Sequence, residues 1–246
     1  MGLTRFDAET AYGTPRDTQA RGENAIEGHP IFAAAYDRFG GVGEGFLRDH
    51  RQYLARDLEG SVLDLGAGTG DMFPYFARAA AAGGESEGAN ASEDGTAQGL
   101  AFHGIEPDPH MKRRAKRAAS EGPLDIDLRL ARAESLPYPD DSIDVTVASL
   151  VFCTISDPEH AFAEVSRVLR PGGELRFLEH VRSDGLLGHA QDVLAPAWKI
   201  VGAGCHLDRD FEGLLARSPL ETIDVETIRA PPPATPILRG RALKRP

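Results

Sequence analysis

The sequence has few cysteines, few aromatic residues and no long apolar run. Its 246 residues include two cysteines and one tryptophan, and 7% of them are aromatic. Two cysteines cannot form a disulfide framework or a four-cysteine zinc site, so we expect a reducing compartment, the cytoplasm. Because no apolar stretch approaches about 20 residues, we expect no transmembrane segment. The polar first residues do not resemble a signal peptide.

Positive charge is also scarce. Lysine and arginine number 27 against 38 aspartate and glutamate residues, which gives a net charge of -11. Proteins that bind nucleic acid through its phosphates need a basic surface, so we expect no nucleic-acid partner. The apolar share of 41% over this length fits a globular domain with a sizeable core.

Short apolar segments alternate with segments of helical periodicity along the chain. The expected strands are 61–65, 100–105, 124–130, 143–151, 174–178, 222–228 and 235–242. The expected helical segments are 29–56 in two pieces, 72–82, 111–120, a helix that begins at Asp157-Pro158, and 186–217 with interruptions. This alternation predicts an α/β fold with a mostly parallel sheet and helices on both faces.

Two segments lack any such pattern. Residues 1–28 show no sustained period and are expected to form a loose leader. Residues 83–99 are small, polar and acidic, a composition that predicts a disordered insert. We therefore expect one domain over residues 29–246, with the insert inside it.

The candidate chemistry follows from the strand ends, because open α/β sheets bind ligands beyond the carboxyl ends of their strands. The first strand leads into Gly66-x-Gly68-x-Gly70, which allows a tight turn and a close approach of the backbone to a ligand. Glu106 lies 36 positions after Gly70, or 21 without the 15 insert residues Gly84 to Gln98. At that spacing, a carboxylate can accept hydrogen bonds from ribose hydroxyls.

Several ordered motifs stand at the ends of the expected strands and in the turns that follow them. They are Val62-Leu63-Asp64-Leu65-Gly66-Ala67-Gly68-Thr69-Gly70, Ala133-Glu134-Ser135-Leu136-Pro137-Tyr138 with Asp144-Val145-Thr146-Val147, and Leu169-Arg170-Pro171-Gly172-Gly173. They resemble the motifs of the class I S-adenosylmethionine-dependent methyltransferases, specifically the methyltransferase type 11 family. The resemblance implies a Rossmann-like fold with seven strands, the C-terminal one antiparallel, and S-adenosyl-L-methionine as the cofactor. It also implies the cofactor-binding residues Asp64, Gly66, Gly68 and Gly70 near the methionine half, Glu106 at the ribose, Ala133 and Glu134 at the adenine, and Ser149 at a neighbouring strand end.

The last third of the chain carries three further segments, Glu179-His180-Val181, Leu194-Ala195-Pro196-Ala197-Trp198 and Gly204-Cys205-His206-Leu207-Asp208-Arg209. They resemble the C-terminal half of the small thiol S-methyltransferases and their prokaryotic relatives. The resemblance implies in-line methyl transfer to a small-molecule acceptor, with a thiol slightly favoured. Quinone C-methyltransferases and phospholipid N-methyltransferases share this frame and stay open as alternatives. A protein that binds S-adenosylmethionine without transferring its methyl group is an alternative of another class.

His180 is the candidate catalytic residue, because it follows a strand end at the edge where the acceptor is expected. It would act as a general base or, in our preferred interpretation, position the substrate. Cys153 has a second interpretation as a small buried hydrophobe. Cys205, His206 and Asp208 lack a second ligand pair at metal spacing, so we expect no metal site.

Overall fold

The structure, a computed structural model, describes residues 44–86, 99–201, 204–230 and 235–246. The predicted leader 1–28 lies outside these residues. Of the predicted insert, residues 83–86 continue a helix and 87–98 lie outside the described part. Among the described helices, none is long and apolar enough to cross a membrane.

Seven strands form one sheet. They are β1 Ser61–Leu65, β2 Ala101–Ile105, β3 Ile126–Arg129, β4 Ile143–Ser149, β5 Leu169–His180, β6 Leu220–Ile228 and β7 Ile237–Lys244. Their order is β3-β2-β1-β4-β5-β7-β6, and β7 runs antiparallel to both of its neighbours. The predicted mostly parallel sheet with an antiparallel C-terminal strand is therefore confirmed.

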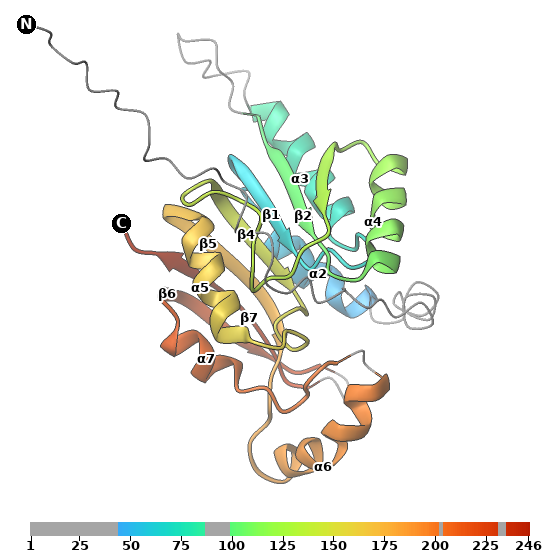
Figure 1. Ribbon diagram of the computed structural model, residues 1–246, viewed down its shortest axis with the longest axis vertical. Helices are drawn as coiled ribbons and strands as arrows, with labels where there is room; N and C mark the ends of the chain where they lie inside the picture. The colour runs from blue at the N-terminus through green and yellow to red at the C-terminus, as the bar shows by residue number, and fades with distance from the viewer. Residues whose placement is uncertain (1–43, 87–98, 202–203, 231–234) are drawn as a thin grey trace, which may run out of the picture.

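Helices cover both faces of the sheet (Figure 1). They are α2 Glu44–Leu54, α3 Phe73–Ser86, α4 Pro109–Glu121, α5 Pro158–Val168, α6 Gly185–Val201 and α7 Phe211–Arg217. Each face of the sheet has its own buried apolar cluster. One joins α2, α3 and α4 to Val62, Val145 and Val147, and the other joins α5 and α7 to Leu63, Leu65 and Phe177. Successive residues of one strand point to opposite faces, so a central strand such as β1 is apolar on both.

Two helix starts follow directly from the sequence. Asp157 precedes Pro158, and its carboxylate accepts a hydrogen bond from the His160 amide at 3.1 Å. Asp108 caps α4 in the same way through two amides. Aspartate at the cap and proline in the first turn both favour a helix start.

The start of β5 differs from the prediction. The strand was expected from residue 174, but it begins at Leu169 and includes the Arg170-Pro171-Gly172-Gly173 turn. Leu169 pairs with Ile143, and the next pair is Glu174 with Val145. The turn is thus a bulge within the strand, and Gly172 at its tip has a φ of 84°.

The strand order places a reversal between β1 and β4. From β1 the chain proceeds outward through β2 to β3, and then returns to add β4 on the other side of β1. Ligands of open α/β sheets bind in the crevice at such a reversal, beyond the carboxyl ends of the strands. The segments that follow β1, β2, β4 and β5 therefore define the candidate site.

Candidate active site

The glycine loop after β1 is open at one of its three glycines. Gly66, Gly68 and Gly70 have φ values of 73°, 57° and 96°. A Cβ at Gly66 would lie 2.8 Å from the Val151 side chain, and one at Gly70 would lie 2.7 Å from Phe73. At Gly68 the nearest such atom is 3.9 Å away. Gly66 and Gly70 are thus required by packing, whereas the space beside the Cα of Gly68 is open.

Glu106 closes this loop from the end of β2. Its Oε2 accepts a hydrogen bond from the Gly68 amide at 2.9 Å, and its Oε1 accepts one from the Asp108 amide at 2.8 Å. Burial raises the pKa of Glu106 to about 7, while these two hydrogen bonds act in the opposite direction. The carboxyl group therefore lies where the sequence spacing places it, directly after β2 and against the loop.

Asp64 is a second buried carboxyl group, within β1. It is 2% exposed, and its Oδ2 has no hydrogen-bond partner among the described residues. Burial raises its pKa to about 8, Asp71 adds to the shift, and Arg51 acts against it. A buried carboxyl oxygen without a partner in the protein normally accepts a hydrogen bond from a ligand or a water molecule.

Arg51 was not predicted from the sequence. It is 4% exposed, it forms ion pairs with Glu44 and with Asp71, the latter at 3.1 Å, and so it places a positive charge near Asp64. The signal was present in the sequence, because Arg51 lies between Leu47 and Leu54 at helical spacing on the buried face of α2. A charged residue within an apolar stripe indicates a buried ion pair.

The other predicted cofactor residues lie in different surroundings. Ala133 is buried in the core, and Glu134 accepts a hydrogen bond from the Asp157 amide at 3.3 Å, which ties its loop to the start of α5. Ser149 ends β4, and its Oγ is buried without a partner in the described part of the chain. Ser149 and Asp64 thus both present unpaired polar atoms on neighbouring strands.

Glu179 organises the turn that follows β4. It is fully buried, and its carboxylate accepts hydrogen bonds from the amides of Val151, Phe152 and Cys153 at 2.8, 2.9 and 3.3 Å. Burial raises its pKa to about 8, opposed by these hydrogen bonds. Leu150 at the start of the turn has a φ of 62°, a strained value for leucine. Sequence reasoning missed this role, because nothing in the local pattern shows which amides a carboxylate will face.

His180 lies beside both cysteines. Its Nδ1 is 4.0 Å from the Sγ of Cys205, and the Sγ of Cys153 completes a cluster whose three atoms all lie within 4.8 Å of one another. The Cys153 thiol and then His180 hold the pKa of Cys205 below that of an ordinary thiol. Cys205 was considered from the sequence together with His206 and Asp208, but it lies with Cys153 and His180, which come from two other segments.

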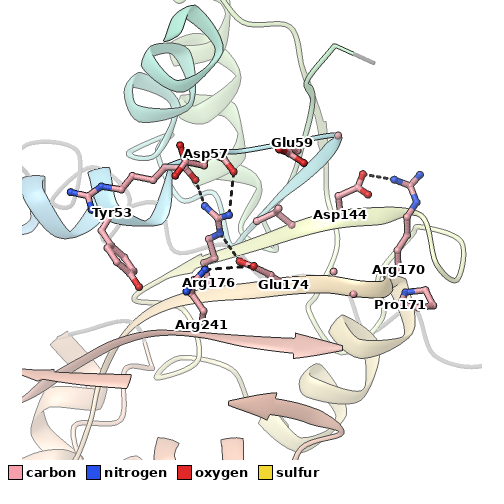
Figure 2. Close-up of a pocket in the computed structure, with 14 residues that line it drawn as sticks. Tyr53, Asp57, Glu59, Asp144, Arg170, Pro171, Glu174, Arg176 and Arg241 are labelled. Atoms are coloured by element: carbon pink, nitrogen blue, oxygen red, sulfur yellow. Dashed lines mark hydrogen bonds and ion pairs between the residues drawn. The ribbon is translucent and has the colours of Figure 1, made fainter. Parts of the chain in front are cut away.

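A cavity of about 670 Å³ lies at the opposite edge of the sheet, near the amino ends of β1 and β4 (Figure 2). Several of its charged side chains are paired with one another. Arg176 contacts Glu174 at 3.1 Å and the Asp57 carbonyl at 3.3 Å, and Arg170 forms an ion pair with Asp144. Because it lies away from the strand reversal, we place the candidate active site at the carboxyl edge instead.

The comparisons with known proteins agree with this geometry. Residues 83–177 match a family model described as a methyltransferase domain. The chain is 30% identical over 205 residues to the thiol S-methyltransferase TMT1B of Rattus norvegicus, covering 77% of this chain and 75% of the relative. The chain belongs to the S-adenosylmethionine-dependent methyltransferases, and S-adenosylmethionine is its cofactor.

Two further comparisons extend the likeness. A phosphatidylethanolamine N-methyltransferase of Cereibacter sphaeroides is 29% identical, over 78% of this chain and 85% of the relative. A crystal structure of an S-adenosylmethionine-dependent methyltransferase from Aquifex aeolicus superposes with a TM-score of 0.54 at 14% identity, over 89% of this chain and all of the other. The enzyme class and the fold are thus established, and the relatives differ in the acceptor that their names state.

Proposed function

We propose that the enzyme methylates the sulfur of a small thiol. The observation that carries this proposal is the 30% identity to a thiol S-methyltransferase over three quarters of that protein's length. The geometry supports it, because Glu179, the carboxyl group within the end of β5, is fully buried and already accepts hydrogen bonds from three backbone amides, so it is not open to act as a base. A thiol needs little help from a base, since its pKa of about 8.5 already supplies some thiolate near neutral pH.

For the cofactor, we infer that the loop after β1 and the two buried carboxyl groups form the binding site. Bound S-adenosylmethionine supplies a methyl group on a positively charged sulfonium sulfur. Glu106 would accept hydrogen bonds from the ribose hydroxyls, and the Gly68 backbone would lie against the cofactor. Asp64, whose Oδ2 finds no partner among the described side chains and amides, would accept from the methionine half. Carboxylates suit a cationic cofactor that carries no phosphate.

The remaining cofactor residues complete this proposal at two places. Ala133 and Glu134 would lie near the adenine, with Glu134 held by the start of α5. Ser149 at the end of β4 would donate from its buried hydroxyl group. The protein's main task in the reaction is then to align the acceptor and to exclude water, which accounts for a large share of such rate enhancements.

The acceptor would enter where β5 ends, beside His180 and α6. In our proposal, His180 positions the acceptor and is not its base. His180 is partly exposed, so a small molecule can reach it, whereas Glu179 next to it is fully buried and occupied by three backbone amides.

A lipid amine is the second candidate acceptor. The observation that favours it is the apolar surface of α6, where Leu186, Val193 and Leu194 are 89%, 79% and 53% exposed. The relative that is named for phosphatidylethanolamine methylation is consistent with such an acceptor. Exposed apolar side chains near an acceptor site suit a lipophilic substrate of either chemistry.

The test is the formation of S-adenosylhomocysteine with a panel of acceptors. The panel holds two matched pairs and a quinol. The pairs are an alkyl thiol with the alcohol of the same shape, and phosphatidylethanolamine with phosphatidylcholine as its control. We expect turnover with the thiol and none with the alcohol of the same shape. Turnover with the lipid amine alone would establish the second candidate. Binding of S-adenosylmethionine without turnover on any acceptor would favour the non-catalytic alternative.

A further inference from the structure

Three separate segments bring metal-ligand side chains to one place. Cys153 lies in the turn after β4, His180 ends β5, and Cys205 follows α6. Each offers one ligand atom, and the three atoms lie within 4.8 Å of one another. The two cysteines are 2% and 7% exposed, while His180 is partly exposed.

Backbone hydrogen bonds hold these segments together independently of the three side chains. The His206 amide donates to the Cys153 carbonyl at 2.8 Å, which links the two cysteine segments directly. The Arg182 amide donates to the Arg209 carbonyl at 3.2 Å, which links the chain after β5 to the chain after Cys205. The position of the ligand atoms is therefore set by the fold, as a preformed site requires.

We propose that Cys153, His180 and Cys205 bind a zinc ion. Tetrahedral zinc with Zn–S distances near 2.3 Å and Zn–N distances near 2.0 Å separates its ligand atoms by about 3.5–3.8 Å. The Cys205 sulfur and the His180 nitrogen are already 4.0 Å apart. All separations stay within 4.8 Å, so rotations of the side chains are enough to reach the tetrahedral distances.

The donor set selects the class of cation. Two thiolates and an imidazole are ligands of zinc or of monovalent copper, whereas magnesium and calcium take oxygen ligands. A tetrahedral zinc with three protein ligands keeps its fourth position for water or another ligand. His180 is partly exposed, so water or a small ligand can reach the cluster.

A buried carboxyl group fixes one end of the cluster. The fully buried Glu179 accepts a hydrogen bond from the Cys153 amide at 3.3 Å, which holds the Cys153 segment against the end of β5. This inference does not depend on the identity of the methyl acceptor.

Metal binding is measured on the full-length chain, purified with reductant and stripped of metal by a chelator. Titration with Co²⁺ should give thiolate-to-cobalt charge-transfer absorption and the visible bands of a tetrahedral site. Zn²⁺ should then displace the cobalt at about one equivalent per chain. Zn²⁺ should also protect both cysteines from alkylation. Monovalent copper that binds in place of Zn²⁺ and Co²⁺ would overturn the assignment to zinc.

Three variants locate the site. Cys205→Ser and His180→Gln should each weaken Zn²⁺ binding by about 100-fold or more, because each removes one of three ligands. His206→Gln is the matched control next to Cys205, and it should bind Zn²⁺ like the parent. The His180→Gln variant keeps both buried cysteines, so its folding can be verified by circular dichroism even if the cysteine variant does not fold.

Two outcomes would overturn the proposal. One is a folded parent chain that shows no thiolate-to-cobalt band, in which case the cysteines are packing residues or form a disulfide with each other. The other is a band that persists in folded His180→Gln with unchanged affinity. Either result concerns metal binding alone and leaves the acceptor assay to judge the proposed function separately.

Discussion

Replacing Glu106 should weaken cofactor binding without unfolding the enzyme. Its carboxylate accepts hydrogen bonds from the Gly68 and Asp108 amides, and in our proposal also from the ribose hydroxyls. A hydrogen bond to a charged group contributes about 1.5–3 kcal/mol, so Glu106→Ala should lower the affinity for S-adenosylmethionine by roughly 10- to 150-fold. Glu106→Gln should also lose affinity, because a glutamine oxygen can replace only one of the two carboxylate oxygens.

The same residue makes cofactor binding depend on pH. The pKa of Glu106 is about 7 in the absence of cofactor. Binding of a cationic cofactor favours the ionised carboxylate, so about half a proton should be released from Glu106 per cofactor near pH 7. Affinity should therefore rise with pH up to and slightly beyond neutrality. Calorimetry in two buffers of different ionisation enthalpy measures the protons released.

The variants provide the control for that measurement. In Glu106→Gln the release should decrease but not vanish, because Asp64 with its pKa of about 8 also titrates. Asp125→Ala, on the exposed surface, should bind cofactor like the parent. Unchanged affinity and unchanged proton release in a folded Glu106 variant would refute the placement of the ribose at this carboxylate.

Three further substitutions test other parts of the site. Gly68→Ala should lower cofactor affinity, because the added Cβ would occupy the open space beside this residue. It should also lower the free energy of unfolding by about 1–2 kcal/mol, because alanine disfavours the positive φ. An unchanged affinity by calorimetry would contradict a close contact between the cofactor and this glycine. Arg51→Leu should lower the free energy of unfolding by about 1–3 kcal/mol, because the half-buried Glu44 and Asp71 lose the buried cation with which they pair, and a urea titration that matches the parent would contradict that role. His180→Ala should raise KM for the acceptor more than it lowers kcat. A rate loss of about 10²–10⁴-fold that high pH rescues would instead indicate a general base.

The sequence predicts the sheet well because its strands are short apolar segments between clear helix and turn signals. The seven expected strands are all present, and the strand reversal lies between β1 and β4. The start of β5 is the exception. A Pro-Gly-Gly sequence indicates a turn, and the pattern cannot show that the strand resumes its pairing on both sides of that turn.

The site is predictable only in part, because its contacts join distant segments. Glu106 could be placed from spacing, since the end of a strand fixes its position relative to the glycine loop. The cluster of Cys153, His180 and Cys205 could not, because its members are separated by 27 and 25 residues along the chain. Only the pairing of β4 with β5 and the return of the chain after α6 bring them together.

The carboxyl edge of the sheet combines buried acidic groups in a way that links cofactor binding to stability. The ordinary pKa values of Glu106 and Asp64, which apply in the unfolded chain, are 4.5 and 3.8. Folding raises the pKa of Glu106 to about 7 and that of Asp64 to about 8. Raised pKa values mean that the fold binds these protons more tightly than the unfolded chain does. The two groups therefore contribute stability below about pH 4, and that contribution is lost as pH rises to about 8.

A cationic cofactor reverses that loss, because its positive charge and hydrogen-bond donors favour the ionised carboxylates. The difference in melting temperature between the cofactor-bound and cofactor-free enzyme should then grow from pH 5 to about pH 8 at a fixed excess of S-adenosylmethionine. S-adenosylhomocysteine, which lacks the sulfonium charge, should show a weaker pH dependence. The buried carboxyl groups Asp64 and Glu106 thus lower the stability of the cofactor-free enzyme near neutral pH. They also favour S-adenosylmethionine over the product that lacks its sulfonium charge, and such a preference helps the product to leave after each turnover.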